Sequence, residues 1–112
     1  KKIVGAVTTD DTTEGTLTFA DITTDTTIAS STIGASGALL KAVNAGAATG
    51  TTATVTGIVY ATDVFANGVG TVAFSADVNA AVNFDGEDGI ITIAADKKIV
   101  GAVTTDDTTE GT

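Results

Sequence analysis

The chain has 112 residues, a formal net charge of −9, and neither histidine nor cysteine. The acidic balance argues against binding to nucleic acid or to an anionic membrane surface, because both need a positive patch. Without His and Cys, the chain cannot carry out Ser–His or Cys–His catalysis or form a thiolate metal site, so we do not expect an enzyme. No apolar run approaches the ~20 residues of a membrane span, so we do not expect a membrane-inserted segment.

Strand-like runs alternate with turns along the whole chain. Thr, Val and Ile dominate the runs, and β-branched side chains favour extended backbone. Gly, Asn and Asp mark the turns, since these residues tolerate positive φ or hydrogen-bond their own backbone. In chain order, the predicted strands cover residues 2–7, 16–19, 26–33, 53–60, 71–84 and 90–95, with turns at 8–15, 44–50, 66–70 and 85–89.

Residues 37–46 fit either a strand or a short helix. Leu39, Leu40 and Val43 stand at helical spacing, and Ser36 could cap a helix. A strand over Leu39–Val43 is equally allowed. We favour the strand, because neighbouring strands would otherwise lose their hydrogen-bond partners.

The clearest strand pattern covers residues 72–84. Apolar residues fall on one face of this run, and most of the opposite face is polar, as in Ser75, Asp77 and Asn83. This alternation with period two predicts a half-buried strand. Because 13 residues exceed the usual strand length of about 5–6, we expect a bend near Asp77–Asn79.

A Gly-led pattern recurs at about 20 residues. The segments starting at Gly15, Gly70 and Gly89 share the form Gly-x-apolar-x-apolar followed by small residues and Asp, and Gly50 begins a looser relative. Short coils of this length predict an all-β, right-handed parallel β-helix (β-solenoid), in which each coil stacks on the one below. The alternative is an antiparallel β-sandwich adhesin repeat, because about 100 residues also suit an immunoglobulin-like domain.

The two ends of the chain carry the same sequence. Residues 1–16 and 97–112 both read KKIVGAVTTDDTTEGT, with an offset of 96 residues. Such self-similarity is typical of repeat architectures. We therefore interpret residues 1–96 as one full tandem repeat of about five coils, 97–112 as the start of the next repeat, and 1–16 as the junction with the preceding one.

Several segments resemble a known family. GTLTFAD, GTVAFSADV, ALLKAVNAG, IVYATDV and KKIVGAVTT are similar to the repetitive passenger regions of bacterial autotransporter adhesins, notably the rickettsial outer-membrane surface antigens. The resemblance implies a β-helical rod at the extracellular face of a bacterial cell, with a host-cell receptor as a candidate partner. It carries over no receptor-binding residue.

The one candidate ligand is Ca²⁺. Asp85, Glu87 and Asp88 fall in one acidic turn, and Asp10, Asp11 and Glu14 form a second acidic loop, which recurs as Asp106, Asp107 and Glu110. Ca²⁺ takes six to eight oxygen ligands, often from a tight loop. Neither loop has the EF-hand or nonapeptide pattern, and solvated turns that keep a rod soluble are the simpler interpretation.

Three functions fit these patterns. The leading one is a secreted structural or adhesive protein that forms a rod-like surface stalk or fibre, and cut sheet edges predict that it associates end to end with itself. The second is a β-sandwich adhesin with Ca²⁺ between its repeats. The third is a self-assembling extracellular filament or surface-layer subunit.

Overall fold

The described part of the protein is built entirely of β-strands and irregular segments. The computed structural model describes residues 3–29, 31–85, 88–105 and 111–112. Within these ranges it contains no helix, which confirms the all-β prediction. In the ambiguous segment 37–46, residues 40–46 belong to strand β4 and residues 37–39 lie in the loop before it, so the turn predicted at 44–50 was wrong over residues 44–47. The strands are β1 Glu14–Ile22, β2 Thr26–Ile28, β3 Thr32–Ile33, β4 Leu40–Ala47, β5 Thr52–Val55, β6 Ile58–Ala66, β7 Thr71–Phe74, β8 Val78–Phe84, β9 Ile90–Ile93 and β10 Val103–Thr105.

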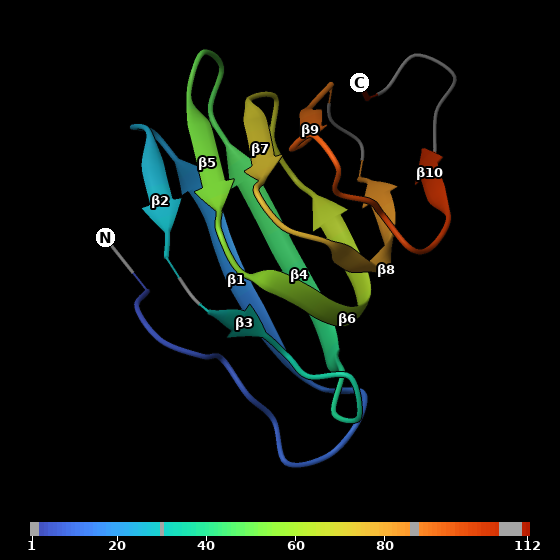
Figure 1. Ribbon diagram of the computed structural model, residues 1–112. Helices are drawn as coiled ribbons and strands as arrows, with labels where there is room; N and C mark the ends of the chain where they lie inside the picture. The colour runs from blue at the N-terminus through green and yellow to red at the C-terminus, as the bar shows by residue number, and fades with distance from the viewer. Residues whose placement is uncertain (1–2, 30, 86–87, 106–110) are drawn as a thin grey trace.

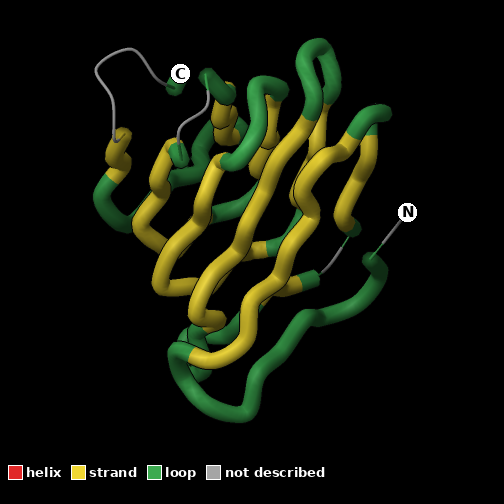
Figure 2. Tube along the Cα trace, turned by 180° about the vertical axis from the view of Figure 1, so that it is seen from behind, coloured by secondary structure: helices red, strands yellow, loops and turns green. Residues whose placement is uncertain are grey.

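The strands form two sheets, and the chain passes back and forth between them (Figure 1). The larger sheet has the order β1-β4-β6-β8-β10, with β3 also paired to β6, and the smaller sheet has the order β2-β5-β7-β9. Seen from behind, the strands of the larger sheet lie side by side (Figure 2). Every pair of named strands is parallel. This pairing is not that of the antiparallel sandwich, which was the alternative prediction.

The pairing register aligns apolar residues in columns that cross the sheets. One column of the larger sheet is Val7, Ile33, Val59, Val78 and Ile99, and a second is Leu17, Val43, Val64, Val82 and Val103. In the smaller sheet, a third column is Ile28, Val55, Phe74 and Ile93. Each member lies beside a residue of the same character in the next strand, because parallel strands in register place equivalent side chains together.

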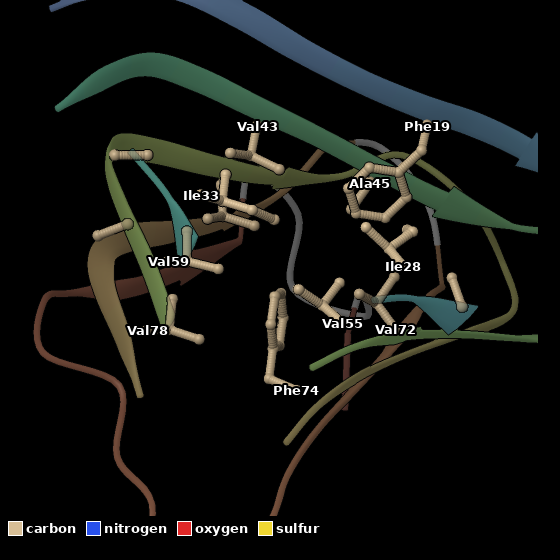
Figure 3. Packing of buried hydrophobic residues seen from close by; sticks show 14 of the residues in the cluster. Phe19, Ile28, Ile33, Val43, Ala45, Val55, Val59, Val72, Phe74 and Val78 are labelled. Carbon is tan, nitrogen blue, oxygen red and sulfur yellow. The ribbon is translucent and has the colours of Figure 1, made fainter. Parts of the chain in front are cut away.

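The core lies between the two sheets. Figure 3 shows Val43 and Val59 of the larger sheet pointing toward the side chains of Val55 and Phe74 from the smaller one. These four residues belong to a single buried cluster. Val and Ala fill most of it, with Phe19 and Phe74 as its aromatic members. Small side chains suit the narrow space between stacked strands, so the scarcity of aromatics in the sequence has a structural cause.

Residues 72–84 form two strands that meet at a corner. The predicted inward face is buried at Val72, Phe74, Val78, Ala80, Val82 and Phe84. The predicted bend is a break at residues 75–77, between β7 in the smaller sheet and β8 in the larger one. Alternation alone could not distinguish a bent strand from a corner, because the inward face keeps its phase across the break. The predicted strand 53–60 is divided in the same way, between β5 and β6.

Three of the four Gly-led segments occupy equivalent places. Gly50, Gly70 and Gly89 each precede a strand of the smaller sheet by one or two residues, and Thr52, Thr71 and Ile90 pair in successive strands. Gly15 does not follow this rule, since it lies within β1 of the larger sheet and β2 takes the smaller-sheet place. Its equivalence was wrongly predicted, because a loop over 8–13 lets the chain re-enter the larger sheet.

Two loops interrupt the first strands of the larger sheet. The loop at 34–39 separates β3 from β4, although both pair with the single strand β6. The loop at 8–13 separates Val7 from β1 at the same place in the preceding layer. The Thr13 N–H donates to the Leu39 carbonyl at 2.8 Å, so the two loops are tied together. The N-terminal layers therefore contain more residues than the later ones, and the extra residues lie in these loops and not in additional strands.

Candidate functional site

The first acidic loop is held by its own backbone. Asp10, Asp11 and Glu14 are all exposed. The Thr12 N–H donates to Oδ1 of Asp11 at 2.7 Å, and the Thr9 hydroxyl donates to the Asp11 carbonyl at 3.0 Å. These are short-range turn contacts, which Asp and Thr commonly make in loops. The local hydrogen bonds account for Asp11 without a ligand.

The second acidic turn lies at the other end of the sheet strands. Asp85 follows β8, whereas residues 10–13 precede β1, and both strands are parallel members of the larger sheet. Oδ2 of Asp85 accepts a hydrogen bond from Nδ2 of Asn67 at 2.8 Å. Asp88 is exposed, and Glu87 lies outside the described residues, as do Asp106, Asp107 and Glu110. Opposite strand ends mean that the two loops do not form one shared site.

The described carboxylates form no cluster with metal-site geometry. No group of three or more His, Cys, Asp or Glu side chains among them could hold a metal ion. Beside Asp85, Oδ1 of Asn67 is buried and has no hydrogen-bond partner among the described residues. Calcium binding at Asp85, Glu87 and Asp88, or at Asp10, Asp11 and Glu14, stays a prediction.

Other carboxylates tie one layer of strands to the next. Oδ1 of Asp25, just before β2, accepts the Thr52 N–H at the start of β5 at 2.8 Å. Oδ1 of Asp77, just before β8, accepts the Lys98 N–H at 3.2 Å. Backbone N–H groups at sheet corners lack ladder partners, and a carboxylate from the preceding layer satisfies them. These aspartates have a structural role that the sequence pattern did not reveal.

A polar row crosses the outer face of the larger sheet. Thr18, Asn44, Asn83 and Thr104 lie in one row of paired residues, in which Phe65 of β6 is the single apolar member. Nδ2 of Asn44 donates to the Thr18 hydroxyl at 3.3 Å, Nδ2 of Asn83 donates to Oδ1 of Asp63 at 3.1 Å, and the Thr104 hydroxyl donates to Oδ1 of Asn83. Sequence reasoning missed this row, because its members are 18–26 residues apart and only the register brings them together.

The last strands present apolar side chains to solvent. Val103 of β10 is 56% exposed and Val100 is 48% exposed, while Ile90 of β9 is also exposed. At the N-terminal end of the stack, Val4, which forms a bridge with Ala29, is 71% exposed. Ile99 and Val103 belong to columns that are buried in the interior strands. Apolar side chains at these two ends of the stack are thus less covered than their counterparts in the interior strands.

The comparisons with known proteins supply no function. No protein-family model, curated protein or solved structure matches the chain. The described residues also contain no helix that could serve as a membrane span. The features of the chain that bear on its function are the stacked parallel strands, the exposed apolar residues at the ends of the stack and the repeated terminal sequence.

Proposed function

We propose that the chain is part of a secreted tandem-repeat protein whose coils stack as a β-solenoid and form a rod-like surface stalk or fibre. The observation that carries this proposal is the parallel pairing of both sheets in chain order, with pairing partners spaced by 18–27 residues. A chain that returns to the same sheet after each such interval climbs by one strand per coil. The sixteen-residue repeat at an offset of 96 supports continuation of the stack.

The mechanism of such a rod is mechanical. Backbone hydrogen bonds run from layer to layer along the stack axis, and columns such as Val43–Val64–Val82 fill the interior. Asp25 and Asp77 tie neighbouring layers at the corners. A solenoid of this kind is stabilised mainly by contacts between adjacent layers, so repeats extend its length without a new core.

Display outside the cell is the second part of the proposal. The resemblance to autotransporter adhesin passengers supports a place at a bacterial cell surface, and the net charge of −9 keeps such rods apart in solution. Many copies of one repeat present the same outer face many times, so avidity can replace a strong single contact with a host receptor. The polar row from Thr18 to Thr104 is the face that repetition would multiply.

Electron microscopy of proteins with two, four and six 96-residue repeats tests the rod. If the coils continue as a solenoid, each added repeat of four to five layers lengthens the particle by about 19–24 Å, because strands stack at about 4.8 Å. Independent domains joined by linkers would lengthen it by a whole domain diameter and would show beads. A bead pattern would overturn the solenoid.

Self-assembly is the alternative function that one observation favours. The exposed Val100 and Val103 at one end, and Val4 at the other, suit head-to-tail contacts, which generate open filaments. Sedimentation of the 112-residue chain across a range of concentrations tests this alternative. Growth of long species supports a filament, whereas a monomer at all concentrations leaves only covalent repetition as the means of elongation.

A further inference from the structure

The same terminal sequence docks in two different places. In the leading copy, the Val7 N–H donates to the Thr32 carbonyl at 3.0 Å, and the Gly34 N–H donates to the Val7 carbonyl at 2.8 Å. Val7 thus uses both of its backbone groups toward β3. In the trailing copy, the residue equivalent to Val7 is Val103, and it lies beside Val82 of β8.

Val103 uses the opposite edge of the strand. The Val82 N–H donates to the Ala102 carbonyl at 2.8 Å, not to that of Val103. In a pair of parallel strands, only one of two facing residues directs its own N–H and C=O toward the partner strand, and the other directs them away. Here Val82 is the residue that bonds toward β10, and Val103 is the residue that faces it. The N–H and C=O of Val103 therefore point away from β8, toward the edge of the sheet that no described strand covers.

The two placements are complementary. The backbone groups that bind Thr32 and Gly34 in the leading copy are the ones that the trailing copy leaves on its outer side. The side chains agree as well, because Val7 and Val103 both lie in the inward columns of the larger sheet. One strand with this sequence could thus pair with β8 through one edge and with β3 through the other.

We propose that β10 is a shared strand: while it pairs with its own β8, its outer edge binds residues Thr32–Gly34 of a second copy, in the place of that copy's residues 3–9. The inference rests on the proposed stacking and adds the register of the junction. Ile33 of the second copy then adjoins Val103, which lies in the column of Val82, and not Ile99, which lies in the column of Val78. The second copy is therefore shifted along the strand direction by the four residues from Val78 to Val82, which is about 13 Å at 3.3 Å per residue.

The displaced segment is weakly held, which makes the exchange feasible. Val4 is largely exposed. Among the described residues, residues 3–7 pair with the rest of the chain through two isolated bridges, Val4–Ala29 and Val7–Ile33. The replacing segment has the same sequence, so it can form with the second copy the hydrogen bonds that the displaced segment gives up. Exchange of an identical element between protomers is a low-cost route to assembly.

Disulfide cross-linking tests the register, because the chain has no cysteine of its own. In the shared-strand arrangement, Ala102 of one copy takes the place of Ala6, next to Thr32 of the other. A mixture of Thr32→Cys and Ala102→Cys chains should then give a disulfide-linked dimer under mild oxidation. The Ala6→Cys/Thr32→Cys double variant is the matched positive control, and it should close within one chain.

A second pair of variants separates this arrangement from simple stacking. If β10 only stacks on β1 of the next copy in column register, Thr104 adjoins Thr18, and Thr104→Cys with Thr18→Cys gives the dimer instead. That result would overturn the shared strand and leave the rod intact. If assemblies form but neither pair cross-links, the shared strand is again overturned; if no assembly forms at any concentration, both it and the self-assembly on which it depends are wrong.

Matched substitutions in the same cysteine variants add a second test of the junction. Val7→Asp in the Thr32→Cys chain should increase the yield of the Thr32–Ala102 cross-link, because it weakens the binding of that chain's own residues 3–9 to Thr32–Gly34. Val103→Asp should abolish the cross-link, because it places a charge in the shared strand. Equal effects of the two substitutions would contradict the proposal, since the two residues have the same local sequence but different roles in it.

Discussion

Val82 and Val103 are the same residue type in the same column, yet their surroundings differ completely. Val82 is fully buried between β6 and β10, whereas Val103 is 56% exposed because no described strand covers its outer side. Burial in this fold therefore depends on having a layer on both sides, more than on the apolar character of the residue. Interior layers should tolerate change poorly and end layers well.

The largest contrast should come from the column in the smaller sheet. Phe74 is almost fully buried, and Ile93 in the next strand is only half-buried. We expect Phe74→Ala to lower the free energy of unfolding by about 4 kcal/mol, because it leaves a large cavity. Ile93→Ala should cost roughly 1 kcal/mol, since solvent already reaches the side chain. Urea unfolding of both variants checks the comparison, and equal losses would contradict it.

Two glycines with similar backbone angles give the next contrast. Gly34 has φ 73° and Gly50 has φ 75°, so alanine is strained at both. At Gly34 a Cβ would collide with the Tyr60 carbonyl of the adjacent layer, while at Gly50 it would meet open space. We expect Gly34→Ala to cost about 3 kcal/mol and Gly50→Ala about 1 kcal/mol. Thermal unfolding of the two variants measures the difference, which is the cost of contact between layers.

A smaller effect should follow from cutting one tie between layers. Asp25→Ala removes the acceptor of the Thr52 N–H, and we expect a loss of about 1 kcal/mol, with the charge-assisted bond as the cause. Asp88→Ala is the matched control, since Asp88 is an exposed aspartate in a turn. Similar unfolding midpoints for both variants would show that the tie contributes little.

The difference between features within one layer and contacts between layers also explains which parts of the fold could be predicted from the sequence. The inward face of residues 72–84 follows from side-chain character, which acts within one layer, whereas side-chain character left the strand at 40–47 open and the need for hydrogen-bond partners in neighbouring strands decided it. The Gly70 and Gly89 segments were correctly aligned, whereas the Gly50 segment is one residue out of register, because Thr52 pairs with Thr71.

Features that depend on register between layers could not be predicted. The row from Thr18 to Thr104 and the ties from Asp25 and Asp77 depend on the register between layers, and the place of Gly15 in β1 depends on the loop at 8–13. Asp77 was predicted as a polar residue of the strand at 72–84, and Asp25 lay outside the predicted turns, so the sequence did not reveal which backbone N–H each carboxylate reaches. Contacts between layers therefore need coordinates, whereas the strand character of each layer can be read from the chain.

We expect the smallest effect on stability from Ca²⁺. The comparison is between the acidic turns and the Asp25 and Asp77 carboxylates, which stabilise the contact between layers. Asp11 and Asp85 already accept hydrogen bonds within the chain, and the two loops lie at opposite strand ends. We therefore expect millimolar Ca²⁺ to leave the unfolding temperature nearly unchanged. A ligand that binds only the folded state must stabilise it in proportion to the logarithm of its concentration over Kd. A rise in unfolding temperature with Ca²⁺ that chelator reverses would thus locate a site, and its loss in Asp85→Asn but not in Asp10→Asn would assign that site to the turn after β8.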